Sequence, residues 1–169
     1  MDVEGNHLAS IGTKSQNSTT GPLFVTDLGG NDVISTGAGT KIVLAGDGAD
    51  TVSAGVGATS DHIVFGDNGL ITYVAMDLAG EGLPRLYEST DMLASTGGND
   101  TITVGDGNNV ILGGMGIDTI TSGTGTDTIL GDNGFVEKDA EGNHFKLIQT
   151  KSQNTTTGTQ FVTDLGGGD

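Results

Sequence analysis

The chain contains no cysteine and no tryptophan, and only 4% of its 169 residues are aromatic. Without cysteine no disulfide can stabilise a small core, and so few aromatic residues leave little bulk for a large one. A narrow solenoid, in which each layer buries little, needs less bulk than a globule does. A metal ion is the common stabilising element that remains for an extracellular domain of this composition.

Positive charge is also scarce, since 6 Lys and Arg residues stand against 22 Asp and Glu residues, for a net charge of −16. Nucleic acid and anionic membranes are poor partners for such a charge. No apolar run reaches 18 residues, which argues against membrane insertion, and we expect no N-terminal secretion signal in this sequence. The usual nucleophile, zinc-protease and phosphate-loop motifs are missing too, so we expect no enzyme.

What the sequence does contain is 31 glycines and a nine-residue beat of glycine and aspartate. Five aspartates each stand two residues before a β-branched apolar residue, at steps of nine or eighteen within each half of the chain: Asp32, Asp50, Asp100, Asp118 and Asp127. Glycine permits tight turns with positive φ, and carboxylates with nearby carbonyls are hard oxygen ligands. The spacing therefore predicts a coil whose preferred cation is calcium, although each aspartate taken alone also fits a turn that needs no metal.

The chain also repeats itself on a longer scale. Shifting it by 137 residues places residues 1–32 on residues 138–169 with 22 of 32 positions identical. A weaker duplication relates Gly66-Asp67-Asn68-Gly69 to Gly131-Asp132-Asn133-Gly134. Each long repeat therefore has two halves, and we expect the chain to be cut from a longer tandem array.

The repeats predict how the chain is divided. We expect β-coil halves at 27–69 and 95–134, β-hairpin insertions at 70–94 and 135–163, part of another insertion at 1–26, and the start of the next repeat at 164–169. The hairpin turns are expected at 79–82 and 141–143. The expected coil strands are centred on Ile34, Val43, Val52 and Ile63 in the first half and on Ile102, Ile111, Ile120 and Ile129 in the second.

These motifs resemble the RTX family of calcium-binding nonapeptide repeats, written G-G-x-G-x-D-x-U-x with U a large apolar residue. Residues 113–121, Gly-Gly-Met-Gly-Ile-Asp-Thr-Ile-Thr, fit that pattern completely. The resemblance implies an all-β fold, a parallel β-roll or β-solenoid, with two nonapeptides per turn and calcium between turns stacked on the same edge. It covers about half of the chain, and the hairpin insertions lie outside it.

The resemblance also implies a set of metal ligands. One edge would carry Asp32, Asp50 and Asp67 in the first half and Asp100, Asp118 and Asp132 in the second, with the motif glycines Gly30, Gly48, Gly98 and Gly116. On the other edge Lys41 and Asn109 replace aspartates, which leaves Asp61 and Asp127 without a carboxylate partner. We expect calcium to be weak or absent there, with the Lys41 ammonium substituting for the ion. The register near Asp61 stays open, because His62 is the alternative occupant of that position.

The strands of the second edge are apolar on both sides of their central residue, as in Ile42-Val43-Leu44 and Val110-Ile111-Leu112. A strand that is apolar on both faces is normally covered. We therefore expect the hairpins, or a neighbouring chain, to pack on the sheet that these strands form.

Taken together, the sequence favours a calcium-binding structural module of a large secreted or cell-surface protein, such as a fibre, filament, adhesin stalk or surface layer. Calcium ions and identical repeats are the expected partners, the latter through end-to-end or lateral self-association. The alternatives are a recognition module whose hairpins bind a glycan or a surface, and a calcium-dependent accessory region of a secreted enzyme.

Overall fold

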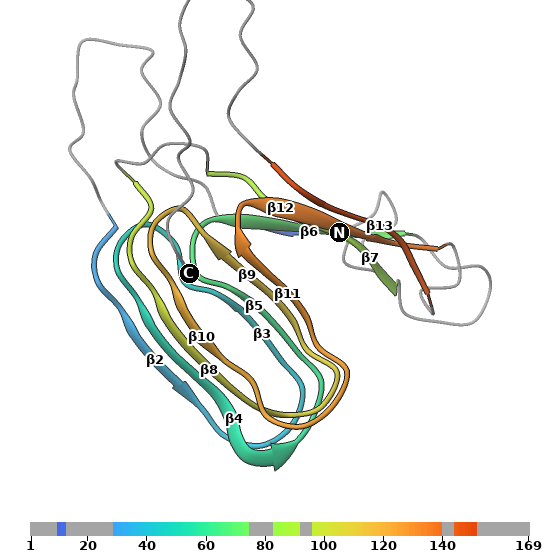
Figure 1. Ribbon diagram of the computed structural model, residues 1–169, viewed down its shortest axis with the longest axis horizontal. Coiled ribbons are helices and arrows are strands. Elements are labelled where there is room, and N and C mark those ends of the chain that lie inside the picture. The colour runs from blue at the N-terminus through green and yellow to red at the C-terminus, as the bar shows by residue number, and fades with distance from the viewer. Residues whose placement is uncertain (1–9, 13–28, 75–82, 92–95, 140–143, 152–169) are drawn as a thin grey trace, which may run out of the picture.

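The computed structural model describes residues 10–12, 29–74, 83–91, 96–139 and 144–151, and these residues form three β-sheets (Figure 1). No helix in this part of the chain is long and apolar enough to cross a membrane. The expected hairpin turns at 79–82 and 141–143 and the start of a further repeat at 164–169 lie outside the described residues. So do most of the expected segment 1–26 and residues 152–163 of the second insertion.

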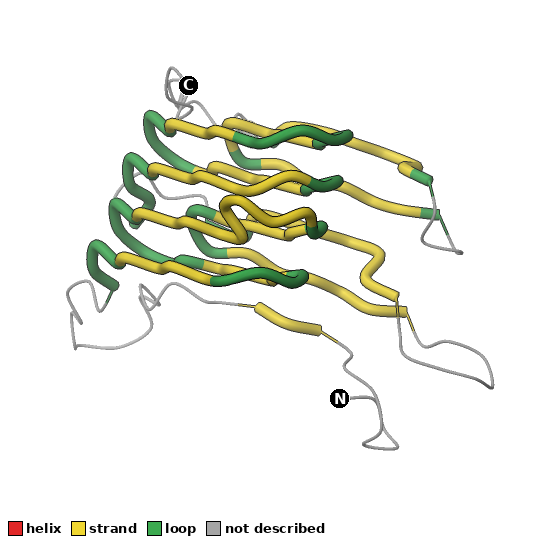
Figure 2. The backbone as a smooth tube through the Cα atoms, turned by 90° about the horizontal axis from the view of Figure 1, so that it is seen from below, coloured by secondary structure: helices red, strands yellow, loops and turns green. Residues whose placement is uncertain are grey.

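Two parallel four-stranded sheets form the roll that the nine-residue beat predicts. Strands β2 (Val33–Thr36), β4 (Thr51–Thr59), β8 (Thr101–Asp106) and β10 (Thr119–Thr121) make the first roll sheet, in the order β10-β8-β4-β2. Strands β3 (Lys41–Leu44), β5 (His62–Phe65), β9 (Val110–Gly114) and β11 (Thr128–Asp132) make the second roll sheet, in the order β11-β9-β5-β3. Successive strands alternate between the two sheets, and the turns stack along one axis (Figure 2).

The roll continues without a break from one half of the chain to the other. Strand β4 pairs in parallel with β8, where Val52 lies opposite Ile102, and β5 pairs in the same way with β9. Of the 35 residues between β5 and β8, residues 69–74 and 83–89 lie in another sheet, and β8 continues the roll one turn beyond β4. The two halves are therefore layers of one solenoid rather than separate units.

A thin core fills the space between the two roll sheets. Its buried members come from the centres of the strands and include Val43, Val52, Val64, Ile102 and Ile111. One expected centre was wrong by one residue, because Val64 rather than Ile63 pairs with Val43 and with Ile111. The physical reason is the longer β4, which continues to Thr59 and shifts the register of the next strand.

The third sheet is antiparallel and contains the hairpin insertions. Its strands are β1 (Ser10–Gly12), β6 (Gly69–Val74), β7 (Leu83–Ser89), β12 (Gly134–Lys138) and β13 (Phe145–Thr150), in the order β1-β6-β7-β12-β13. The two predicted hairpins, β6–β7 and β12–β13, are both present. The sequence did not predict that β7 pairs with β12, which joins the hairpins into one continuous hairpin sheet.

The hairpin sheet covers the outer face of the second roll sheet (Figure 1), as the apolar strands predict. A second core lies between them, in which Phe65 and Leu112 of the roll meet Ile71, Tyr87 and Val136 of the hairpins. Leu112 is 1% exposed and Leu44 is partly buried against this cluster. The outer face of the first roll sheet instead carries Ser and Thr, which suits a face in contact with water.

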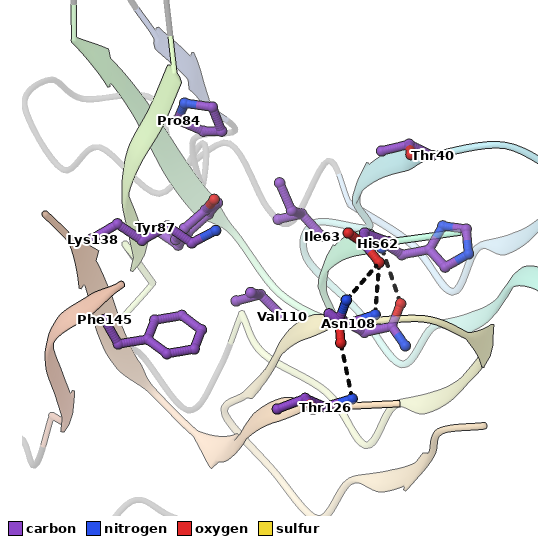
Figure 3. Close-up of a pocket in the computed structure, with 12 residues that line it drawn as sticks. Thr40, His62, Ile63, Pro84, Tyr87, Asn108, Val110, Thr126, Lys138 and Phe145 are labelled. Atoms are coloured by element: carbon purple, nitrogen blue, oxygen red, sulfur yellow. Dashed lines mark hydrogen bonds between the residues drawn. The ribbon is translucent and has the colours of Figure 1, made fainter. Parts of the chain in front are cut away.

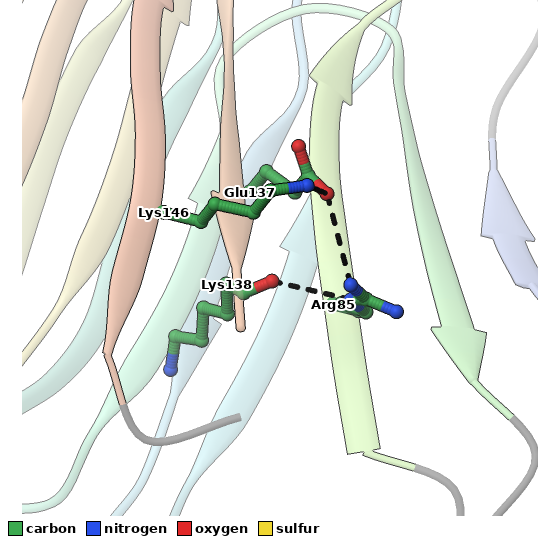
Figure 4. Close-up of polar contacts among 4 residues, drawn as sticks. All are labelled: Arg85, Glu137, Lys138 and Lys146. Atoms are coloured by element: carbon green, nitrogen blue, oxygen red, sulfur yellow. Dashed lines mark hydrogen bonds and ion pairs between the residues drawn. The ribbon is translucent and has the colours of Figure 1, made fainter. Parts of the chain in front are cut away.

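Polar contacts tie neighbouring strands of the hairpin sheet to each other (Figure 4). The Glu137 carboxylate of β12 accepts a 2.8 Å hydrogen bond from Nζ of Lys146 on β13 and lies 3.9 Å from the Arg85 guanidinium on β7. Arg85 Nε also donates to the carbonyl oxygen of Lys138 at 3.2 Å. One carboxylate thus links three strands, although its exposure limits the stabilisation from each pair.

Candidate metal centre

Four aspartates form a ladder along one edge of the roll, each at the residue before a strand of the first roll sheet. The amide of Asp32 donates to Oδ1 of Asp50 at 2.7 Å, the amide of Asp50 to Oδ1 of Asp100 at 2.8 Å, and the amide of Asp100 to Oδ1 of Asp118 at 2.9 Å. Asp50, Asp100 and Asp118 therefore each use one carboxylate oxygen to bind the backbone of the preceding turn. We call this column of residues 32, 50, 100 and 118 the aspartate ladder.

The other carboxylate oxygens of Asp50 and Asp100, the two inner residues of the ladder, make no such hydrogen bond. Oδ2 of Asp50 and Oδ2 of Asp100 are buried and accept no hydrogen bond, and both residues are 1% exposed. Burying a carboxylate oxygen without a partner is costly, so these atoms indicate that a cation belongs beside them. Burial raises the pKa of Asp50, against the hydrogen bond from the Asp32 amide. It also raises the pKa of Asp100 to about 6.

Asp67 lies on the same edge but not in the ladder. Its backbone amide donates to the carbonyl oxygen of Gly113 and its Oδ2 accepts from the amide of Met115, so it occupies the turn position equivalent to Gly114. Burial raises the pKa of Asp67 to about 8, against the Met115 hydrogen bond, and the charges of Asp100 and Asp118 add to the effect. Its Oδ1 is buried without a hydrogen-bond partner.

The expected order of ligands on this edge is corrected accordingly. Asp67 does not follow Asp50 in the stack, because Asp100 does, and Asp132 pairs in register with Gly114 rather than standing above Asp118. The cause is that the two halves stack without a break. The Gly-Asp-Asn-Gly segment that ends each half therefore lies in a turn that precedes the ladder residues, and not in the ladder. Asp67 and the ladder still meet, since Asp67 interacts electrostatically with both Asp100 and Asp118.

The four motif glycines form a second column beside the ladder. A Cβ on Gly48 would lie 2.5 Å from the carbonyl oxygen of Gly30, one on Gly98 would lie 2.1 Å from that of Gly48, and one on Gly116 would lie 1.9 Å from that of Gly98. Gly48 and Gly116 also have positive φ, 121° and 124°. Only glycine allows these turns to stack so closely with their carbonyl groups on the same edge.

Two further glycines show where carboxylate and carbonyl oxygens converge. The position of a Cβ on Gly66 would be 2.1 Å from Oδ2 of Asp100 and 2.4 Å from the carbonyl oxygen of Gly113. The position of a Cβ on Gly113 would be 2.4 Å from Oδ2 of Asp118 and 2.1 Å from the carbonyl oxygen of Gly131. The same arrangement thus occurs in two successive turns.

This donor set fits calcium. The ion takes six to eight oxygen ligands and accepts backbone carbonyls as readily as carboxylates. Within the described residues, no three His, Cys, Asp or Glu side chains converge on one point. The carbonyl oxygens of the turns must therefore supply much of the coordination, which suits calcium and not a metal that requires nitrogen or sulfur ligands.

The opposite edge carries a different ladder, made of Lys41, His62, Asn109 and Asp127. The His62 amide donates to Oδ1 of Asn109, and the Asn109 amide to Oδ1 of Asp127, both at 3.0 Å. Nζ of Lys41 donates to the carbonyl oxygens of Ala38 and Gly39, at 2.6 and 2.9 Å. The Lys41 ammonium group therefore binds carbonyl oxygens of its own turn at this edge, and its substitution for an ion stays a prediction.

The placement of Asp61 in this ladder was wrong, and His62 holds that position instead. Lys41 pairs with His62, so Asp61 lies one residue earlier, where it is exposed and its Oδ1 accepts the Asn108 amide at 2.7 Å. Asp127 does lie in the ladder, and its carboxylate accepts from the amide and the side chain of Asn109. Burial opposes ionisation of Asp127, but these hydrogen bonds and one from Ser122 lower its pKa overall.

Sequence reasoning missed an asparagine column just before each ladder. Oδ1 of Asn31 accepts the Ala49 amide at 3.0 Å, Oδ1 of Asn99 accepts the Ile117 amide at 2.8 Å, and Oδ1 of Asn108 accepts the Thr126 amide at 3.1 Å. The signal was available, because each donor lies 18 residues after its acceptor. These side chains fix the spacing of the turns without needing a metal.

A pocket of about 440 Å³ lies where the second edge meets the hairpin sheet (Figure 3). Its walls are His62, Asn108 and Thr126 from the roll and Tyr87, Lys138 and Phe145 from the hairpins. Tyr87 is 1% exposed and packs in the second core, whereas Phe145 is 44% exposed. The buried tyrosine is thus a packing residue, and Phe145 is the aromatic side chain of the pocket that solvent reaches.

Comparison with known proteins agrees with this geometry. The family model described as RTX calcium-binding nonapeptide repeat (4 copies) matches residues 26–60, 88–120 and 103–135. These ranges contain the whole aspartate ladder and, of the hairpin sheet, only the last two residues of β7 and the first two of β12. No curated protein and no solved structure matches the chain.

Proposed function

Because the chain belongs to the family of RTX calcium-binding nonapeptide repeats, we propose that this calcium-binding repeat module is a structural one, which folds and stiffens when it binds extracellular calcium. The observation that carries the proposal is the aspartate ladder, whose buried Oδ2 atoms on Asp50 and Asp100 lack hydrogen-bond partners. Calcium, when bound, supplies the positive charge that these oxygens otherwise lack.

The residues that would hold calcium are those of the first edge, at successive turns and not at one point. Asp50, Asp67, Asp100 and Asp118 would supply carboxylate oxygens, and the glycine turns beside them would supply carbonyl oxygens. Asp32 and Asp132 belong to the outermost turns on this edge. The second edge has a lysine and a histidine in its ladder, so we propose that its contribution is hydrogen bonding and fixed charge, with weak or no calcium at Asp127.

Folding depends on the cation because the chain has few other sources of stability. It carries a net charge of −16 and no cysteine, and the core of the roll is a thin layer of aliphatic side chains. Repulsion among the carboxylates opposes compaction until a cation neutralises them. Such a module stays unfolded where calcium is scarce and folds where it reaches millimolar concentrations, which suits a protein that acts outside the cell.

The biological role that follows is that of a spacer or filament in a large secreted or cell-surface protein. The solenoid supports it, because stacked turns make a rod whose stiffness comes from nearest-neighbour contacts. We propose that identical modules also associate with each other. Recognition of a glycan or a surface is the other candidate role, and the pocket with the exposed Phe145 is the feature that favours it.

The test is far-UV circular dichroism of the chain across a calcium titration, with magnesium as the control ion. A cooperative gain of β signal that calcium produces and magnesium does not is the expected result. A β fold that is unchanged by a chelator would refute the proposal, since the aspartates would then be turn residues alone.

A further inference from the structure

The hairpin sheet ends at β13 in an edge strand that no described strand covers. All six residues of β13 are exposed, and its outer edge has no pairing partner in the described part of the chain. Phe145, Leu147 and Ile148 are 44, 42 and 48% exposed. An apolar edge strand is a ready template for pairing with another strand.

The internal repeat identifies the strand that fits this edge. The shift of 137 residues places Ser10-Ile11-Gly12 on Leu147-Ile148-Gln149, so β1 is the equivalent of the middle of β13. β13 pairs with β12, but β1 does not. It pairs with the outer edge of β6, with Gly12 opposite Leu70, Ile11 opposite Ile71 and Ser10 opposite Thr72.

The same junction occurs a second time inside the chain. β7 is the return strand of the first hairpin, and it pairs with β12, the first strand of the next, with Glu88 opposite Phe135 and Tyr87 opposite Val136. Glu88 corresponds to Gln149, and Phe135 to Leu70, because each hairpin begins at the glycine of a Gly-Asp-Asn-Gly segment. In both junctions the return strand of one hairpin pairs with the first strand of the next hairpin. The two junctions also have the same register.

From this rule we infer that β13 pairs with β6 of a second copy of this chain, in the place that β1 occupies, with Gln149 opposite Leu70, Ile148 opposite Ile71 and Leu147 opposite Thr72 of that copy. The contact extends the apolar row of the hairpin sheet, in which Ile71, Tyr87 and Val136 are buried and Ile148 is exposed. The occupant that it displaces, β1, is only three residues long.

The two ends of the roll allow a second copy to stack in the same direction as the inferred strand pairing. β10 and β2 are the outer strands of the first roll sheet, and β11 and β3 those of the second. Ile129, a central residue of β11, is 45% exposed, whereas its partner Ile111 in β9 is 0% exposed. Stacking β10 on β2 and β11 on β3 of the next copy repeats the junctions of β4 with β8 and of β5 with β9, and it covers Ile129. The contact joins different surfaces of the two copies, so it continues into an open chain of molecules rather than a closed dimer.

This inference rests on the proposed module for its biological use, and a crosslinking experiment tests it separately. The chain has no cysteine, so Thr72→Cys with Leu147→Cys introduces the sole thiols. Within one molecule β6 and β13 are separated by β7 and β12, roughly 14 Å at about 4.7 Å per strand, which is too far for a disulfide. Across the inferred junction the two residues face each other directly.

The matched control is Thr72→Cys with Gln149→Cys, which keeps the thiols on the same sheet face but two residues out of register, about 7–8 Å apart. In calcium under mild oxidation we expect a ladder of covalent multimers from the Leu147 pair, at least several times the yield of the Gln149 pair. Equal yields from the two pairs in chains with the same β signal would overturn the inference. A loss of calcium dependence in the circular dichroism of the parent chain would instead count against the proposed function alone.

Discussion

The amide of Asp50 donates a 2.8 Å hydrogen bond to Oδ1 of Asp100, fifty residues further along the chain. The bond joins the two halves of the sequence in the same way that Asp32 joins Asp50 and Asp100 joins Asp118 within each half. The candidate metal-binding edge is therefore continuous across the hairpin insertion. A hairpin can be inserted into such a solenoid because it leaves and re-enters at adjacent turns.

Removing charge from the ladder should weaken the response to calcium. Asp100→Asn keeps the oxygen that accepts the Asp50 amide but removes the negative charge from the partnerless Oδ2. An interaction with a charged group contributes about 1.5–3 kcal/mol, so the calcium midpoint of folding should rise roughly 10- to 100-fold. The control is Asp61→Asn, at an exposed position outside both ladders. Circular dichroism across a calcium titration measures both, and equal midpoints would contradict the assignment of the site.

The calcium-free fold should be more stable in acid than at neutral pH. The folded-state pKa values of Asp67 and Asp100, about 8 and about 6, lie above the ordinary value of 3.8. The folded state then binds more protons than the unfolded state, so the free energy of unfolding falls as the pH rises from about 4 to about 8. Far-UV circular dichroism in chelator at pH 5 and pH 8 measures the folded fraction, which should be larger at pH 5. A larger β signal at pH 8 would contradict the burial of free carboxylates.

Calcium binding should also release protons near neutral pH. In the folded chain without the ion Asp67 is mostly protonated at pH 7, because its pKa is about 8. A metal ligand must be deprotonated, so binding displaces the proton. An osmolyte that favours burial keeps the calcium-free chain folded for this test. Titration with calcium in two buffers of different ionisation enthalpy should then give different apparent heats at pH 7. The difference should vanish in Asp67→Asn.

The glycine column should tolerate no side chain in its interior. Gly116→Ala would place a Cβ 1.9 Å from the carbonyl oxygen of Gly98 at a φ of 124°, so we expect a loss of several kcal/mol, with backbone strain alone costing about 1–3 kcal/mol. Gly30→Ala is the matched control, because nothing lies within 4 Å of its Cβ position. The two variants should differ clearly in urea midpoint at saturating calcium. Equal midpoints would show that the turns are less closely stacked.

The contact between roll and hairpins should contribute to stability as a normal core does. Leu112→Ala removes a side chain that is 1% exposed between the second roll sheet and the hairpin sheet. The expected cost is about 2–5 kcal/mol, because a buried leucine is lost and a cavity remains. Ile42→Ala, in the same sheet but 38% exposed, should cost clearly less. Similar losses for the two variants would indicate that the hairpin sheet does not cover the roll in solution.

The sequence by itself determined the roll, its two alternating edges and the aspartates of the ladder. It could do so because each turn contacts only its neighbours, so a nine-residue spacing translates directly into spatial stacking. The covered face was predictable for a related reason. A strand with apolar residues on both sides of its centre, such as Val110-Ile111-Leu112, has no water-facing side.

Only the tertiary structure decided where the repeats depart from the beat. The added length of β4 moves His62 into the position that spacing assigned to Asp61, because strand register depends on pairing and not on residue count. Likewise Asp67 stands beside the ladder and not in it, since Asp50 stacks directly on Asp100. The junction of β7 with β12 was also beyond the sequence, because strands from separate hairpins pair only when the roll brings both to the same face.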